Sequence, residues 1–121
     1  MIYANVTRKE SIILPIKEKK MEQLTLSIKF FVSSENKELF KTTLVDLFDQ
    51  ISKEPSFINA SLHEGIENPN EILVFENWGS SVEEFLTYQM AKDYRIPFEQ
   101  FLKDFNVRRE PGIFAKFAQW G

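Results

Sequence analysis

The sequence predicts one α+β domain in which an antiparallel sheet carries helices on a single face. Three observations support this fold class. Residues 24–32 alternate between apolar and polar side chains, residues 39–51 and 81–105 carry apolar residues at helical spacing, and residues 57–78 hold two further strand-like runs. A length of 121 residues suits a single domain.

The first predicted strand has one clearly apolar face, formed by Leu24, Leu26, Ile28, Phe30 and Val32. Ser33 and Ser34 then offer a helix cap, with acidic residues in the first turn, where the helix dipole favours them. The helix that follows is expected to end before Pro55, because a residue preceding proline disfavours helix. Its apolar stripe comprises Leu39, Phe40, Leu44, Leu47, Phe48 and Ile51.

A hairpin is predicted next, with strands at 57–64 and about 72–78 separated by Gly65 and Asn68-Pro69-Asn70. Ser81 and Glu84 have the spacing of a capping box, which predicts that a second helix starts there.

Pro97 interrupts the second helix, so two pieces are expected, at about 81–92 and 97–105. Residues 110–112, Glu-Pro-Gly, then predict a turn before a last strand at 113–120.

The predicted order is β-α-β-β-α-β, a ferredoxin-like arrangement with both helices on one face of the sheet. Four apolar residues have strand parity that points them to the opposite face: Phe31, Phe57, Leu73 and Phe75. A sheet with apolar residues on both faces usually buries both, so a cover over the second face is expected. The twelve phenylalanines of this chain favour such an interface as well.

Residues 1–20 differ from the rest, because short apolar pieces alternate with charges before Met21 opens a segment that could fold alone. We expect residues 1–20 to be an N-terminal extension, either an arm or an edge strand, and residues 21–121 to form the domain. The alternative is that Met21 is the natural start.

Composition excludes several classes of function. The net charge of −3 gives no electrostatic case for nucleic acid. There is no cysteine and a single histidine, which excludes thiolate and multi-histidine metal sites, and no metal-binding motif is present. No apolar run has the length of a membrane span and the N-terminus lacks a signal-peptide pattern, so a cytoplasmic protein without a membrane partner is expected.

Several short motifs resemble the antibiotic biosynthesis monooxygenase family of small dimeric α+β barrels, over roughly residues 22–105. They are Glu54-Pro55, Leu62-His63, Asn68-Pro69-Asn70 and the run Glu76-x-Trp78-x-Ser80. The resemblance implies a homodimer whose sheets pack face to face. The sequence departs from the family at Ser56 and Ala60, and one extra residue after Trp78 puts Tyr88 near the place of the family's helix histidine.

The family's activities include oxidation of polycyclic phenols or quinols by molecular oxygen without a cofactor, and haem degradation by an asparagine, tryptophan and histidine triad. Only Trp78 of that triad is present, so we expect no haem degradation. No phosphate loop, dinucleotide fingerprint or Ser-His-Asp arrangement is found either. An oxygenase built from this chain is therefore expected to need no cofactor and no metal.

Three residues are candidates for catalysis, and each has a structural alternative. Histidine is the side chain best suited to act as a base at neutral pH, so His63 could be a general base, or it could be a solvated histidine at a strand end. Tyr88 could donate a hydrogen bond to a substrate oxygen or pack as an amphipathic tyrosine. Glu76 shares strand parity with Trp78, so it could be an inward proton acceptor or a structural carboxylate.

Four residues are candidates for substrate binding. Trp78 could stack on a planar substrate or seal the end of the barrel. Tyr94 could hydrogen-bond a substrate, and Arg95 could hold an anionic substrate oxygen or be a surface residue. Asn59 is a polar residue in mid-strand.

Two functions remain open on these grounds. The first is a cofactor-independent monooxygenase for a small quinol or phenolic compound. The second is a non-catalytic dimeric protein that binds small molecules or acts under stress. Polar groups that converge in a pocket would favour the first, and a pocket filled by Phe85, Met90, Phe98 and Phe101 would favour the second.

Overall fold

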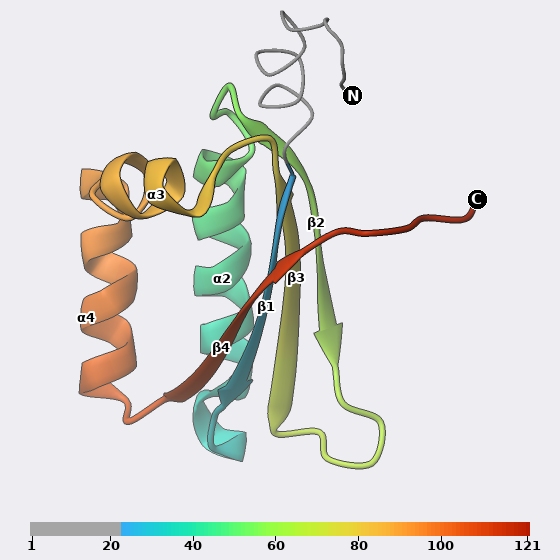
Figure 1. Cartoon of the computed structure of the whole chain (residues 1–121). Coiled ribbons are helices and arrows are strands. Elements are labelled where there is room, and N and C mark those ends of the chain that lie inside the picture. The colour runs from blue at the N-terminus through green and yellow to red at the C-terminus, as the bar shows by residue number, and fades with distance from the viewer. Residues whose placement is uncertain (1–22) are drawn as a thin grey trace, which may run out of the picture.

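The computed structural model describes residues 23–121, which form a four-stranded sheet with helices packed on one face (Figure 1). The strands are β1 (Leu24–Phe31), β2 (Phe57–Glu64), β3 (Glu71–Trp78) and β4 (Arg108–Ala115). The helical elements are η1 (Ser34–Asn36), α2 (Lys37–Ile51), α3 (Val82–Glu84), the π-helical turn η2 (Phe85–Gln89), η3 (Asp93–Arg95) and α4 (Ile96–Asp104). The element order confirms the prediction of an α+β, ferredoxin-like fold.

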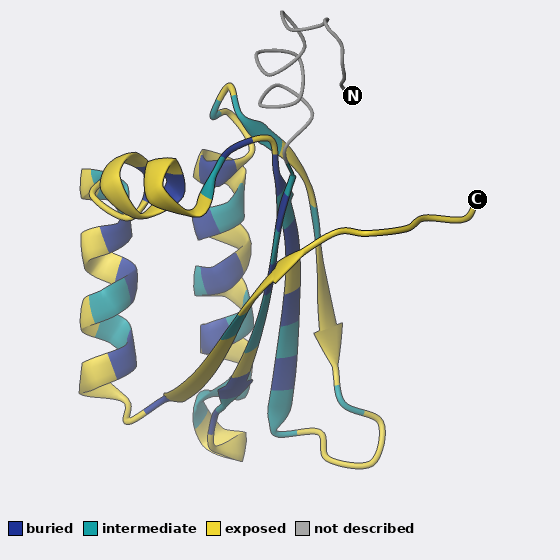
Figure 2. Ribbon diagram, in the orientation of Figure 1, coloured by how far each residue is buried: buried dark blue, intermediate teal, exposed yellow. Residues whose placement is uncertain are grey.

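The strand order across the sheet is β2-β3-β1-β4, and all neighbouring strands are antiparallel. Strand β1 alternates as predicted, with Leu24, Leu26 and Phe30 buried towards the helices. Helices α2 and α4 cover this inner face, which Figure 2 shows as the buried side of the molecule. The core is aromatic where they meet, since the Phe30 ring lies 5.2 Å from Phe40 and 5.8 Å from Phe98.

Helix α2 begins at Lys37, after a short 3-10 turn, and Ser33 makes no side-chain capping bond. The buried stripe of α2 is Phe40, Leu44, Leu47 and Ile51. The sequence placed Leu39 in this stripe, which is wrong, because Leu39 is exposed. Leu39 lies one position before Phe40, about 100° around the helix, so its side chain points away from the sheet. The observed buried stripe is narrower than the predicted one and is wide enough to cover the sheet.

Strands β2 and β3 form the predicted hairpin, with one irregularity. A register shift between Phe57 and Asn59 brings Phe57 opposite Trp78, and its ring packs edge-on against the indole at 5.4 Å. The prediction that Phe57 lies on the outer face is therefore wrong, because a bulge reverses the alternation there. Gly65 closes the hairpin, where a Cβ atom would lie 2.4 Å from the carbonyl oxygen of Asn68.

The chain leaves β3 through the predicted capping box, in which the Ser81 hydroxyl accepts from the Glu84 amide and the Glu84 carboxylate accepts from the Ser81 amide. A π-helical turn follows, closed by the Met90 N–H donating to the Phe85 carbonyl at 3.2 Å. The prediction of a helix in two pieces is confirmed. The break lies at residues 90–92, before Pro97, which occupies the first turn of α4.

The last strand differs from the prediction. Strand β4 spans Arg108–Ala115, so the turn expected at 110–112 and the strand expected at 113–120 are both wrong. Pro111 pairs opposite Ile28 in β1. Strand β4 is an edge strand, so it has positions where no neighbouring strand needs a backbone N–H donor. Proline, which lacks this N–H, fits at such a position. Residues 116–121 have no regular structure and extend away from the sheet (Figure 1).

The outer face, which is the sheet face opposite the helices, is partly apolar and partly polar. Phe75 and Phe114 are exposed there, and Phe117 and Trp120 of the C-terminal segment are 98% and 88% exposed. A polar ladder crosses three strands, because Thr25 donates to the Asn77 amide oxygen at 2.6 Å and Asn77 donates to that of Asn59 at 2.8 Å.

Within residues 23–121, no helix has both the length and the apolar character needed to cross a membrane. The predicted N-terminal extension, residues 1–20, lies outside the described residues.

Candidate functional site

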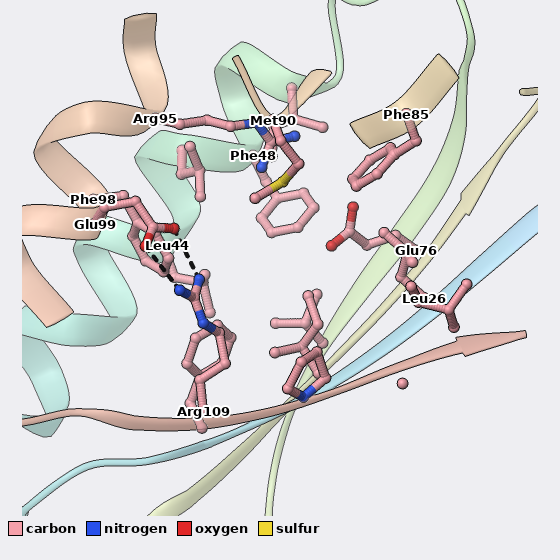
Figure 3. A pocket seen from close by; sticks show the side chains of 18 of the residues that line it. Leu26, Leu44, Phe48, Glu76, Phe85, Met90, Arg95, Phe98, Glu99 and Arg109 are labelled. Carbon is pink, nitrogen blue, oxygen red and sulfur yellow. Dashed lines mark hydrogen bonds and ion pairs between the residues drawn. The ribbon is translucent and has the colours of Figure 1, made fainter. Parts of the chain in front are cut away.

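A cavity of about 280 Å³ lies between the inner face of the sheet and the helices (Figure 3). Strands β1, β3 and β4 form its floor, while α2, the π-helical turn and α4 form its walls. Most of the lining is apolar, including Leu26, Leu44, Phe48, Phe85, Met90 and Phe98. These side chains line the cavity and leave it open, so the space can hold a small organic ligand.

Glu76 brings a carboxylate to this apolar floor. It sits in β3 two residues before Trp78, on the buried side of the sheet, and is 3% exposed. Its Oε1 accepts a hydrogen bond from the Trp78 indole N–H at 2.9 Å. Burial raises the pKa of the Glu76 carboxyl, although the Trp78 hydrogen bond and the positive charge of Arg95 act to lower it. The prediction that Glu76 points inward is confirmed.

Arg95 brings a guanidinium to the same cavity from the end of η3. It is 9% exposed, so the interpretation of Arg95 as a surface residue is wrong. Its Nε donates to the Gln89 carbonyl at 2.7 Å, and the guanidinium lies 5.7 Å from the centre of the Phe85 ring. Among residues 23–121, its Nη2 atom has no hydrogen-bond partner.

A second pair of charges lines the cavity where α4 faces β4. The Arg109 guanidinium donates two hydrogen bonds, both 2.8 Å long, to the two carboxylate oxygens of Glu99. This bidentate geometry is the strong form of the pair, and the Arg109 hydrogen bonds hold the pKa of the Glu99 carboxyl below its ordinary value. The pair joins α4 to the edge strand and is already neutral as a unit.

Trp78 and Tyr94 lie behind the cavity wall. Trp78 is completely buried, contacts Phe85 edge-on at 5.2 Å and holds Glu76 by its indole N–H. The Tyr94 hydroxyl donates to Glu54 at 2.8 Å. Burial and this hydrogen bond raise the pKa of Tyr94 to about 12, so its phenol stays protonated at neutral pH.

His63, Asn59 and Tyr88 lie away from the cavity. His63 and Asn59 are exposed on the outer face of the sheet, where the His63 Nε2 atom lies 2.8 Å from the Ser61 hydroxyl. Tyr88 is 64% exposed on the π-helical turn. The structure thus brings together Glu76 and Arg95 of the predicted residues, with Trp78 directly behind Glu76.

Sequence reasoning missed Glu99, Arg109 and the Gln89 carbonyl. Glu99 follows Phe98 on the cavity side of α4, a position at the border of the apolar stripe. Arg109 could not be placed in a strand, because the last strand was expected to start at residue 113, whereas β4 begins at Arg108. The Gln89 carbonyl is available to Arg95 through the π-helical turn, for which the sequence carries no local signal.

Among the described residues, no three His, Asp or Glu side chains are grouped so that they could hold a metal ion.

Comparison with solved structures gives the same fold at low sequence identity. A conserved protein from Methanosarcina mazei Go1 is 20% identical with a TM-score of 0.71, and the match covers 84% of this chain and 99% of that one. SnoaB, a cofactor-independent oxygenase from Streptomyces nogalater, is 17% identical with a TM-score of 0.70, and the match covers 81% and 96%. A search of the curated proteins gave no match.

The solved structures show only the fold, whereas a sequence match to a family model shows the family to which the chain belongs. Residues 24–95, well over half of the chain, match the model of the family described as antibiotic biosynthesis monooxygenase. The matched segment runs from β1 to Arg95, so it contains Glu76 and Arg95 of the cavity lining and ends before Glu99 and Arg109. With its fold and sequence in agreement, this chain belongs to the antibiotic biosynthesis monooxygenase family.

Proposed function

We propose that the protein is a cofactor-independent monooxygenase that oxidises a small phenol or quinol in the cavity between sheet and helices. The observation that carries this proposal is a buried carboxylate, Glu76, and a buried guanidinium, Arg95, in one mostly apolar cavity. Membership of a monooxygenase family supports it, as does a shared fold with a cofactor-independent oxygenase.

In the proposed reaction Glu76 is the general base. Its raised pKa makes the carboxylate a better proton acceptor than an exposed glutamate, so it can take the hydroxyl proton of a bound phenol. Arg95 then holds the phenolate oxygen through its unpartnered Nη2 atom. Trp78 positions the base by its hydrogen bond, and Tyr94 fixes the segment before Arg95 through Glu54.

The oxidation needs only the substrate and oxygen. The phenolate gives electrons to O₂, one oxygen atom enters the ring as a carbonyl, and the other leaves as water, so that phenol plus O₂ becomes quinone plus water. The apolar walls keep bulk water from the anion, which would otherwise solvate it and weaken its interaction with Arg95.

The test is oxygen uptake with a panel of hydroquinones, naphthols and polycyclic phenols, measured above the rate of their autoxidation and with chelator present. We expect the variants Glu76→Gln and Arg95→Gln to lose at least tenfold in kcat/KM for the best substrate. The exposed loop residue Glu67 supplies the matched control, since Glu67→Gln removes a carboxylate far from the cavity.

The assay also separates the other candidate residues and the other function. Loss of activity in His63→Ala or Tyr88→Phe, with Glu76→Gln fully active, would contradict the cavity assignment. If no panel member consumes oxygen faster with protein than without it, the protein is the non-catalytic binding protein and the oxygenase proposal fails.

We further propose that the protein is a homodimer that uses the outer face of the sheet. Exposed Phe75 and Phe114 on that face, and the exposed aromatic residues of the C-terminal segment, support this proposal. The ladder of Thr25, Asn77 and Asn59 would then lie in the interface.

A further inference from the structure

The charged side chains around the cavity differ in whether their hydrogen-bonding atoms have partners. Glu99 and Arg109 neutralise each other through two hydrogen bonds. Arg95 is more than nine-tenths buried, yet it gives its one hydrogen bond among the described residues to a backbone carbonyl, and its Nη2 atom is unpartnered. A buried N–H donor without a partner costs free energy. A ligand that places an acceptor beside the Arg95 Nη2 atom removes that cost and binds more tightly for it.

The size of the cavity limits that ligand. A dry apolar cavity of about 150 Å³ binds benzene, and the cavity here is about 280 Å³. The partly exposed side chains Leu86, Met90 and Ile113 border it, so the ligand meets apolar contacts from its entry inward. One or two fused aromatic rings fit these limits.

We propose that this cavity also binds aromatic carboxylates of one or two rings, with the carboxylate on Arg95, and that each binding event loads one proton onto Glu76. The proposal concerns the same site as the proposed oxygenase and rests on that assignment of Arg95 and Glu76. Such acids would act as competitive inhibitors whose affinity depends on pH.

The proton uptake follows from counting charges. With Glu76 ionised, an entering carboxylate puts two negative charges beside the single positive charge of Arg95, in a site with little water to screen them. A proton on Glu76 restores neutrality. A phenol brings this proton itself, whereas a carboxylate that is already ionised must draw it from the solvent.

Glu76 is the group expected to take the proton, because the other charged groups around it are occupied. Arg109 of β4 and Glu99 of α4 form their own pair. Tyr94, on η3 with Arg95, donates to Glu54. The residues of β1 and α2 that line the cavity are all apolar. Burial already raises the pKa of Glu76, which makes the uptake easier.

The experiment is isothermal titration calorimetry of the full chain with 2-naphthoate at pH 7, in buffers of different ionisation enthalpy. The wild type should take up close to one proton per ligand, and its Kd should rise by up to tenfold per pH unit between pH 6 and pH 8. Glu76→Gln should bind with no proton uptake and a flat pH profile. 2-Naphthol serves as the neutral control and should show no uptake from buffer.

Three results would overturn the proposal: no binding of 2-naphthoate, binding by wild type without proton uptake, or unchanged uptake in Glu76→Gln. Arg95→Gln should bind at least tenfold more weakly, and Arg95→Lys, which keeps the charge, should recover part of the affinity. If Arg95→Gln does not fold, the Glu76→Gln measurement decides alone. Because no oxygen or turnover is involved, this test can fail while the oxygenase activity stands, and the reverse also holds.

Discussion

Replacing Glu76 by glutamine should make the protein more stable at pH 8 and leave it unchanged at pH 4. The variant keeps the shape of the side chain and an oxygen that can accept from the Trp78 indole. The raised pKa of Glu76 means that the folded protein holds the carboxyl proton more tightly than the unfolded chain, whose value is the ordinary 4.5. Between those two pKa values the folded state binds more protons, so the free energy of unfolding falls as pH rises.

The magnitude follows from two opposing contributions. Glutamine gives Trp78 a neutral acceptor in place of a charged one, which costs about 1 kcal/mol. It also removes the desolvation of a buried carboxylate, and the direction of the pKa shows that this contribution is the larger. Each tenfold difference in proton affinity between the folded and unfolded states is equivalent to about 1.4 kcal/mol. We therefore expect a net gain in the free energy of unfolding at pH 8 that grows with this difference in proton affinity.

Urea denaturation of wild type and Glu76→Gln from pH 4 to pH 8, with Glu67→Gln as the matched exposed control, measures this difference. At pH 8 the urea midpoint of the variant should be the higher one, and in a parallel thermal melt each 1 kcal/mol of added stability should raise the melting temperature by about 4 °C. The two unfolding curves should converge below pH 4.5. A variant that is less stable at pH 8, or a difference that does not change with pH, would refute the account of Glu76 as a buried and destabilised charge.

Four further outcomes are expected. Trp78→Ala should lose roughly 3–5 kcal/mol in urea denaturation and Trp78→Phe clearly less, because the phenyl ring keeps contact with Phe57 and Phe85; equal losses would contradict this. Gly65→Ala should lower the melting temperature, since its Cβ atom would overlap a backbone oxygen. Sedimentation should give about twice the monomer mass of 14.2 kDa, and Phe75→Lys should shift it to the monomer; a monomeric wild type would contradict the dimer. The purified protein should be colourless, and stoichiometric metal by elemental analysis would argue against that expectation.

Periodicity predicted the fold well because the buried face of each element is read directly from the sequence. The alternation of β1, the capping box at Ser81 and the broken second helix all follow from residues close together in the chain. Two errors came from strands that violate the simple rules. In β2, a bulge turns Phe57 inward. In β4, Pro111 and Gly112 lie in the middle of the strand; an edge strand tolerates this pair, but in a sequence it is typical of a turn.

The candidate site was harder to predict, since its polar residues come from elements whose contacts are tertiary. Glu76 was accessible from strand parity with Trp78. The burial of Arg95 depends on a hydrogen bond to the Gln89 carbonyl, which no sequence pattern indicates. His63 and Tyr88 have the right chemistry, but the sheet and the helical turn direct them away from the cavity.

The π-helical turn at Phe85–Gln89 has a consequence for how this chain tolerates changes of length. In a π-helical turn the N–H of residue i+5 donates to the carbonyl of residue i, as Met90 does to Phe85, so the turn holds one residue more than an α-helical turn. The family resemblance predicts one extra residue after Trp78, and this turn is the element after Trp78 that holds a residue more than an α-helix would. Deleting one of the exposed residues between Phe85 and Gln89 should restore an ordinary α-helical turn. Because the Arg95 Nε donates to the carbonyl of Gln89, at the end of this turn, such a deletion should also change how Arg95 approaches the cavity.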